Sequence, residues 1–220
     1  MLIAALDATG ESCSVAVADD REVLAEVSSR RTRSQLRNLV PALEAALNQA
    51  GVRLAELDAL AVTVGPGSFT GVRLGVVTAA TLAQAADLPV AAVDSLEALS
   101  RNCPGGGCVV AACDARKGEI VAAAFRPDRV GPNRLLTPGD FHAWVRDLSP
   151  CWVVGNALER YPDLPGGAVA IPRDAWWVRA SAVARLGQRE IREGRGRTWL
   201  ELRPDYVRPA EVQVHPIREG

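Results

Sequence analysis

The amino-acid sequence predicts an α/β fold built from two related lobes. Short apolar stretches with strand character alternate with longer segments whose apolar residues recur every three or four positions, which is typical of this fold class. A strand–turn–strand pattern, LIAALDATGESCSVAVA at residues 2–18, returns as VVAACDARKGEIVAAAF at residues 109–125. The glycine-rich stretch CPGGGC at residues 103–108 separates the two copies, so we expect a second lobe to begin there.

The first elements are a hairpin, a third strand and a helix. LIAALD and SCSVAVAD are joined by a polar turn that contains Gly10, and a third strand runs from Glu22 to about Ser29. The next segment has helical spacing and ends at Gly51, while Pro41 either kinks this helix or marks its true first turn. The apolar positions that define this helix are Leu36, Val40, Leu43 and Leu47.

Further along the first lobe, ALAVTV at residues 59–64 is a buried strand. A helix is predicted over residues 70–86, and Pro89 prevents it from continuing. VAAV follows as a strand, and Ser95 is the expected N-cap of a short helix.

In the second half, CWVVGNA predicts a strand ending at Gly155, and residues 181–194 form an amphipathic helix that stops at Gly194. An extended, proline-marked tail covers residues 203–213. We therefore expect residues 1–104 to form the first lobe, joined by residues 203–220, and residues 105–202 to form the second.

Composition excludes several classes of protein. A net charge of -1 argues against a chain that binds nucleic acid by itself. One segment is locally basic, and it forms either a solvated face or a contact for an acidic partner. It contains Arg30, Arg31, Arg33 and Arg37. Five cysteines without a C-x-x-C pair, and only two histidines, argue against zinc and predict free thiols in a reducing compartment, the cytoplasm. The N-terminus predicts a strand, not a signal peptide, and we expect no membrane span.

The glycine-rich stretch VGPGSFTGVRLG at residues 64–75 matches neither G-x-x-x-x-G-K-[ST] nor G-x-G-x-x-G, so it is weak as a nucleotide motif. In the helix behind it, small residues recur every four positions. Glycine inside a helix costs about 1 kcal/mol relative to alanine, so this stripe indicates close approach of another backbone. That backbone is either the chain's own sheet or a helix of another chain. The stripe consists of Gly71, Gly75, Ala79 and Ala83.

Asp7 ends the first strand, and Asp114 ends its counterpart in the second copy. Such an aspartate either positions a metal-bound nucleotide or caps the turn that follows it. Hydrolytic motifs are missing from the sequence, which contains neither G-x-S-x-G nor H-x-x-x-H.

Four segments together resemble the TsaB family, also called YeaZ, of bacterial proteins needed to make threonylcarbamoyladenosine in tRNA. These segments are LDATGESCSVAV, LAVTVGPGSFTGVRLGV, CDARKGEIVAAAF and PDYVR. The resemblance implies the actin/Hsp70-like ATPase (ASKHA) fold with two RNase-H-like lobes. It also implies a platform that is inactive alone, that binds the catalytic subunit TsaD, forms homodimers and works with the ATPase TsaE. Transfer RNA would be reached only through the complex, ATP or ADP would bind only at the level of the complex, and no membrane would be involved.

The resemblance also implies which residues are used, none of them catalytic or metal-binding. A vestigial nucleotide site would comprise Asp7, Thr9, Gly10 and Asp114. Arg33 stands where family members often have a histidine, and Arg37 and Arg73 could pair with carboxylates of a partner. The partner or dimer interface would comprise Leu36, Val40, Leu43, Leu47, Gly71, Val72, Arg73, Gly75, Val76, Ala79 and Ala83.

Two alternatives stay open at this point. One is an ATP-dependent, kinase-like enzyme on the same fold, which would use Asp7 and Asp114. The other is a peptidase that acts on TsaD.

Overall fold

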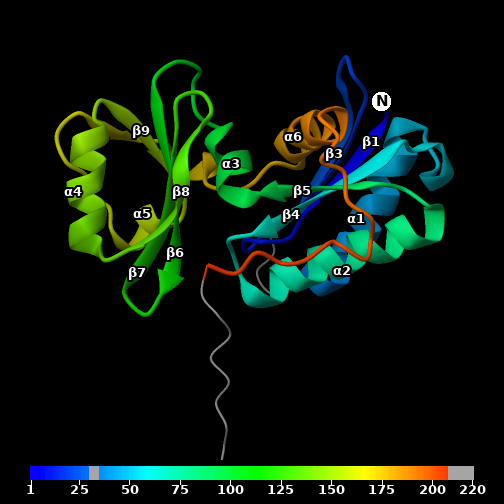
Figure 1. Ribbon diagram of the computed structural model, residues 1–220, viewed down its shortest axis with the longest axis horizontal. Helices are drawn as coiled ribbons and strands as arrows, with labels where there is room; N and C mark the ends of the chain where they lie inside the picture. The colour runs from blue at the N-terminus through cyan, green and yellow to red at the C-terminus, as the bar shows by residue number, and fades with distance from the viewer. Residues whose placement is uncertain (30–34, 208–220) are drawn as a thin grey trace, which may run out of the picture.

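The computed structural model describes residues 1–29 and 35–207, and within them the chain forms two lobes around two five-stranded sheets (Figure 1). The first sheet has the order β3-β2-β1-β4-β5. Its hairpin is antiparallel, with Ile3 facing Ala18 and Asp7 facing Ser14, whereas β1 and β4 run parallel. The strands are β1 (Ile3–Asp7), β2 (Cys13–Ala18), β3 (Val23–Ser29), β4 (Ala59–Gly65) and β5 (Val90–Asp94).

The second sheet repeats the first. Its order is β10-β9-β6-β7-β8, so β6 takes the place of β1, β7 that of β2, and β9 that of β4. The β6–β7 pair is antiparallel and the β6–β9 pair is parallel, as in the first lobe. The duplication predicted from the two strand–turn–strand segments is therefore confirmed. The strands are β6 (Cys108–Arg116), β7 (Glu119–Phe125), β8 (Arg129–Leu136), β9 (Cys151–Val154) and β10 (Ala168–Ala170).

Three helices cover the first sheet. α1 (Gln35–Ala50) and α2 (Phe69–Ala86) lie on one face, and α6 (Ala180–Arg192) lies on the other (Figure 1). The placement of α6 corrects the expected boundary at residue 202, because Val183, Ala184 and Leu186 are buried against the first sheet. An amphipathic pattern shows that a helix needs an apolar partner but does not say which sheet supplies it.

Helices also cover both faces of the second sheet. α4 (Pro138–Leu148) and α5 (Ala157–Arg160) pack on one face, and α3 (Ser95–Ser100) packs on the other. α3 follows directly from β5 of the first lobe, so Leu96 and Leu99 join the two lobes through the second core. Its N-cap is Asp94, whose side chain accepts from the N–H of Glu97, and not Ser95 as expected. Two short 3₁₀ helices, η1 (Leu54–Glu56) and η2 (Arg173–Ala175), complete the elements.

The C-terminal segment returns to the first lobe. Arg197 forms an antiparallel bridge with Val90, and the N–H of Asp205 donates to the carbonyl of Val64 at 2.7 Å. Asp205 thus contacts the first lobe, while residues 208–220, together with Arg30, Arg31 and Arg33, lie outside the described residues. Within the described part, no helix is both long and apolar enough to cross a membrane.

The small-residue stripe of α2 faces the chain's own sheet. Gly71, Gly75, Ala79 and Ala83 are all buried. A Cβ atom on Gly71 would overlap the carbonyl oxygen of Ala8, which directly follows β1. The stripe could approach either the chain's own sheet or a helix of another chain. The structure shows that it approaches the chain's own sheet. The expectation that these residues face another chain is wrong.

Replacement of Gly71 by alanine tests this contact, with Gly75→Ala as the matched control. The added Cβ at Gly71 would meet backbone, whereas the nearest atom to a Cβ at Gly75 is a methyl carbon of Val62 at 3.4 Å. We expect Gly71→Ala to lower the free energy of unfolding by about 1–3 kcal/mol through overpacking. Gly75→Ala should leave it unchanged or raise it by up to about 1 kcal/mol. Urea unfolding measures both, and equal effects would contradict the assignment.

Candidate functional site

Asp7 occupies the C-terminal end of β1 and is almost fully buried, with 1% of its surface exposed. One carboxylate oxygen, Oδ1, accepts hydrogen bonds from the hydroxyls of Thr63 and Thr9, each at 2.7 Å. The other oxygen, Oδ2, has no hydrogen-bond partner among the described residues. Asp7 therefore ties β1, the following turn and β4 together through one oxygen.

The surroundings of Asp7 disfavour its charge. Burial raises the pKa of Asp7, and the hydrogen bonds from Thr63 and Thr9 only partly oppose that effect. A magnesium-nucleotide site, as the fold would imply, needs an ionised carboxylate that is open to the cation and its waters. Asp7 does not fit that requirement. In residues 1–29 and 35–207, no group of three or more His, Cys, Asp or Glu side chains is arranged to hold a metal ion.

The structure brings Asp7 and Asp114 to the same region between the lobes, where both influence the thiol of Cys113. Burial raises the pKa of Cys113 to about 12, and the negative charges of Asp94, Asp7 and Asp114 add to the rise. Asp114 is half-buried; its N–H donates to the amide oxygen of Asn156 at 3.0 Å. Thr9 is buried and Gly10 is partly exposed. The four residues of the predicted nucleotide site thus lie at two strand ends, and nucleotide binding there stays a prediction.

Asp94 was not predicted, yet it connects the lobes. Its carboxylate caps α3, lies 2.8 Å from the guanidinium of Arg129, and accepts from the amide of Asn133 at 2.8 Å. Both partners belong to β8 of the second lobe. A polar cavity of about 370 Å³ opens beside this contact and is also lined by Glu97 and Arg189. The available sequence signal was its position at the end of a strand, as for Asp7, whereas β6 continues two residues beyond Asp114.

The glycine-rich loop after β4 packs on the turn that follows β1. The N–H of Ser68 donates to the carbonyl of Thr9 at 2.7 Å, and a Cβ on Gly67 would lie 2.6 Å from the same oxygen. The hydroxyl of Ser95 donates to the carbonyl of Pro66. Contacts with the chain's own backbone therefore explain these glycines, which make a tight elbow between β4 and α2.

The structure divides the predicted interface residues into two groups. Val40 and Arg73 are exposed, Leu47 is partly buried, and the side chain of Leu36 lies outside the described part. The others are corrected, because they are buried in the core between the helices and the first sheet, which leaves little of their surface accessible to a second chain. The buried residues are Leu43, Gly71, Val72, Gly75, Val76, Ala79 and Ala83.

The outer surface of α1 and α2 presents Val40, which was predicted, together with apolar side chains that were not. Val40 of α1 is 49% exposed, and Val77 and Phe69 of α2 are 63% and 49% exposed. The guanidinium of Arg73 lies 3.8 Å from the ring centre of Phe69, and its Nε donates to the hydroxyl of Tyr206 at 2.8 Å. The sequence pattern did not predict Phe69, Val77 and Tyr206. That pattern was the stripe of small residues, which lies on the opposite face of α2. We call Val40, Phe69, Arg73, Val77 and Tyr206 the outer helix surface.

Comparison with known proteins gives consistent results. The family model described as TsaD, tRNA N6-adenosine threonylcarbamoyltransferase, matches residues 22–134. The tRNA threonylcarbamoyladenosine biosynthesis protein TsaB of Escherichia coli is 35% identical over 184 residues, which cover 79% of each chain. The protein of the same name from Bacillus subtilis is 33% identical over 97% of each chain.

Solved structures agree with these relatives. An uncharacterized protein of Pseudomonas aeruginosa, described as similar to the peptidase YEAZ, superposes with a TM-score of 0.84 at 28% identity and covers 94% of this chain and 99% of its own. The ethanolamine utilization protein EutJ of Carboxydothermus hydrogenoformans (TM-score 0.54, 14% identity, 85% and 90% covered) and the ROK hexokinase of Thermus thermophilus (0.50, 13%, 88% and 100%) share the fold alone. The predicted actin-like ATPase fold is confirmed.

The buried carboxyl of Asp7 predicts a pH-dependent stability. Because its folded pKa lies above the ordinary value of 3.8, ionisation destabilises the folded state as the pH rises through that range, and the full cost is present above the folded pKa. The side chain of Asp7→Asn cannot ionise. The free energy of unfolding of this variant minus that of the natural protein should therefore be larger at pH 8 than at pH 4. Thr63→Val removes a hydrogen bond to the ionised form and should show the opposite trend. Denaturant unfolding at both pH values measures this, and pH-independent differences would refute the assignment.

Proposed function

Because the chain belongs to the TsaB family of tRNA threonylcarbamoyladenosine biosynthesis proteins, we propose that it is a non-catalytic subunit that binds and stabilises a TsaD-type transferase. The observation that carries the proposal is the outer helix surface, whose residues other than Tyr206 lie on the two helices that cover the same face of the first sheet (Figure 1). The complex would act in the cytoplasm together with the ATPase TsaE, and would reach tRNA through its catalytic subunit.

The composition of α2 supports an interface on this surface. Its inner side is buried in the core, yet Val77 remains 63% exposed on the outer side. Arg73 is the only charged residue between Phe69 and Ala86. A helix that is apolar on both sides is typical of one that is covered on both sides. The outer helix surface therefore suits a partner with a complementary apolar face.

The region of the match also supports a TsaD-type partner. The transferase family model covers residues 22–134, which include α1 and α2 and most of the first lobe. Two chains with related first lobes can associate through equivalent surfaces by an approximate two-fold axis, as symmetric dimers do. The same surface would then serve a homodimer and a heterodimer, one at a time.

The environment of Asp7 supports a subunit without catalysis of its own. A buried carboxyl with a raised pKa, held by Thr9 and Thr63, is suited to a structural role at the end of β1. We therefore propose that the isolated chain holds no nucleotide tightly, and that ATP or ADP binds only in the complex.

Replacing Val77 by arginine tests the surface. A charge placed there would be desolvated on association, so we expect binding to the TsaD partner to weaken by tenfold or more, equivalent to about 1.4 kcal/mol. The melting temperature of the free chain should stay within experimental error of the natural value, since Val77 is mostly exposed. The matched control is Val169→Arg, at a valine that is 50% exposed on β10 of the second lobe. Titration calorimetry measures binding to the TsaD partner. The oligomeric state of each isolated variant shows whether the homodimer still forms. Unchanged binding by Val77→Arg would reject this surface.

Calorimetry of the isolated protein with magnesium-ATP tests the absence of catalysis. We expect no binding in the micromolar range, because Asp7 is buried and its charge is disfavoured. Micromolar binding accompanied by ATP turnover, and abolished by Asp7→Asn, would instead establish the ATP-dependent, kinase-like alternative.

A further inference from the structure

Two buried cysteines face each other at the start of two neighbouring strands in the second lobe. Cys108 of β6 and Cys151 of β9 are direct partners in the parallel register. Both side chains belong to the core beneath α4, whereas Val109 and Trp152 point to the opposite face of the sheet. Neighbouring strands lie about 4.8 Å apart, which is within the Cα separation that a disulfide bridges. Both cysteines are free thiols in the structure.

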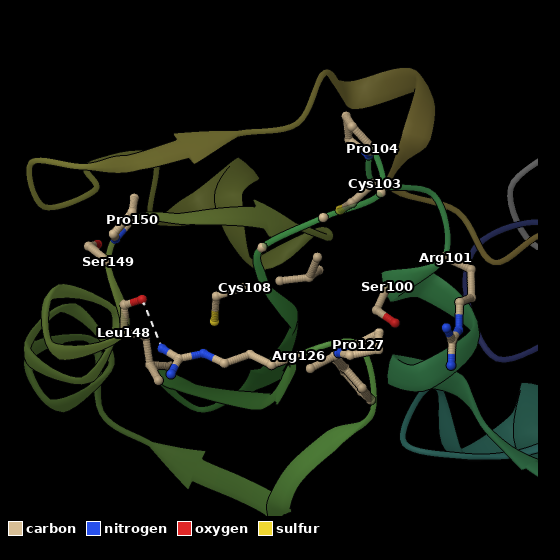
Figure 2. Close-up of a pocket in the computed structure, with 15 residues that line it drawn as sticks. Ser100, Arg101, Cys103, Pro104, Cys108, Arg126, Pro127, Leu148, Ser149 and Pro150 are labelled. Atoms are coloured by element: carbon tan, nitrogen blue, oxygen red, sulfur yellow. Dashed lines mark hydrogen bonds between the residues drawn. The ribbon is translucent and has the colours of Figure 1, made fainter.

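A cavity gives access to one of these thiols. It has a volume of about 970 Å³ and lies beneath the linker between the lobes, where Cys108 lines it with Phe125, Arg126, Leu148 and Pro150 (Figure 2). Cys151 does not line this cavity. Of this pair, Cys108 is therefore the thiol that a small molecule in the cavity can reach.

Arg126 supplies a positive charge beside Cys108. Figure 2 shows the sulfur of Cys108 turned toward Arg126, whose guanidinium donates to the carbonyl of Leu148 at 3.2 Å. A hydrogen bond with the Cys108 sulfur is the main cause that raises the pKa of Arg126. Cys108 therefore has a cation in direct contact with its sulfur, the atom that reacts in thiol–disulfide exchange. Burial raises the pKa of Cys151, and a hydrogen bond with Ser149 only partly opposes this.

We propose that Cys108 is a site of reversible thiol–disulfide exchange with small soluble disulfides, and that Cys151 is its resolving thiol. The Cys108 thiolate attacks one sulfur of the small disulfide, forms a mixed disulfide and releases one thiolate. The thiolate of Cys151 then attacks the Cys108 sulfur, which forms a Cys108–Cys151 disulfide and releases the second thiolate. In sum, two protein thiols are oxidised, the small disulfide is reduced to two thiols, and the two protons pass to the released thiolates.

The neighbouring Cys103 provides the contrast. It also lines the cavity, but it packs with Leu96 and Leu99 in the core on the other face of the second sheet. The thiols of Cys103 and Cys151 are therefore on opposite sides of that sheet. The expected cross-link joins strands β6 and β9, and it does not involve the linker.

Treatment of the native full-length chain with oxidised glutathione tests the proposal. After blocking of free thiols and tryptic digestion, mass spectrometry should find the peptide of residues 102–116 linked to that of residues 147–160, with the loss of two hydrogens. Cys151→Ser should accumulate the glutathione adduct on Cys108, and Cys108→Ser should give neither adduct nor cross-link. Cys103→Ser should form the cross-link as the natural chain does. A cross-link that requires Cys103, or one that forms only in urea, would overturn the proposal.

The role of Arg126 is tested by the rate of the first step. Arg126→Leu should slow adduct formation in the Cys151→Ser background about tenfold, because it removes the cation beside the reacting sulfur, while Arg126→Lys should preserve most of the rate. Circular dichroism melting checks that each variant is folded. Equal rates for Leu and Lys would show that the cation has no part in the reaction.

Discussion

The backbone contact between α2 and the end of β1 is the constraint on which the first lobe depends. Because Gly71 has no side chain, α2 can approach the carbonyl of Ala8 closely enough that a single methyl group would overlap it. The same approach lets the N–H of Ser68 reach the carbonyl of Thr9. Asp7 then lies between Thr9 and Thr63, closed from solvent. The burial of Asp7 at the C-terminal end of β1 therefore depends on the absence of a side chain at Gly71.

Close backbone contacts also form where β4 and β9 end. Gly65 follows the last valine of β4, Gly155 follows the last valine of β9, and both have positive φ values, +125° and +127°. A Cβ on Gly155 would overlap the carbonyl of Ala112 in the neighbouring strand, whereas one on Gly65 would overlap the carbonyl of Asp205. The returning C-terminal segment therefore contacts the end of β4, whereas the end of β9 contacts the backbone of its own sheet.

Local patterns were sufficient to predict the hairpins, the buried strands and the duplication, because alternation and turn residues act over a few positions. They could not assign α6 to its sheet, since Leu186 would be buried equally well against either lobe's apolar face. The stripe from Gly71 to Ala83 indicated close backbone approach correctly, but its spacing suits an internal sheet and an external helix alike. The role of Asp94 could not be predicted, because its partners Arg129 and Asn133 are distant in sequence. They contact Asp94 only in the folded chain, where the two lobes meet.

The inner packing of α2 has a consequence for its outer side. Because glycine and alanine fill the side next to the sheet, the helix needs few large apolar residues to complete its own core, yet it carries Phe69 and Val77 outside. In α6, where Val183 and Leu186 satisfy the sheet, the outer positions are charged, as Arg185 and Arg192 show. The two helices cover opposite faces of the same sheet, so the requirement of the fold does not explain the difference. The partner surface that we propose over α2 would account for it. The ring of Tyr206 stacks on that of Phe69 with centroids 5.3 Å apart, so this side of α2 already carries aromatic packing.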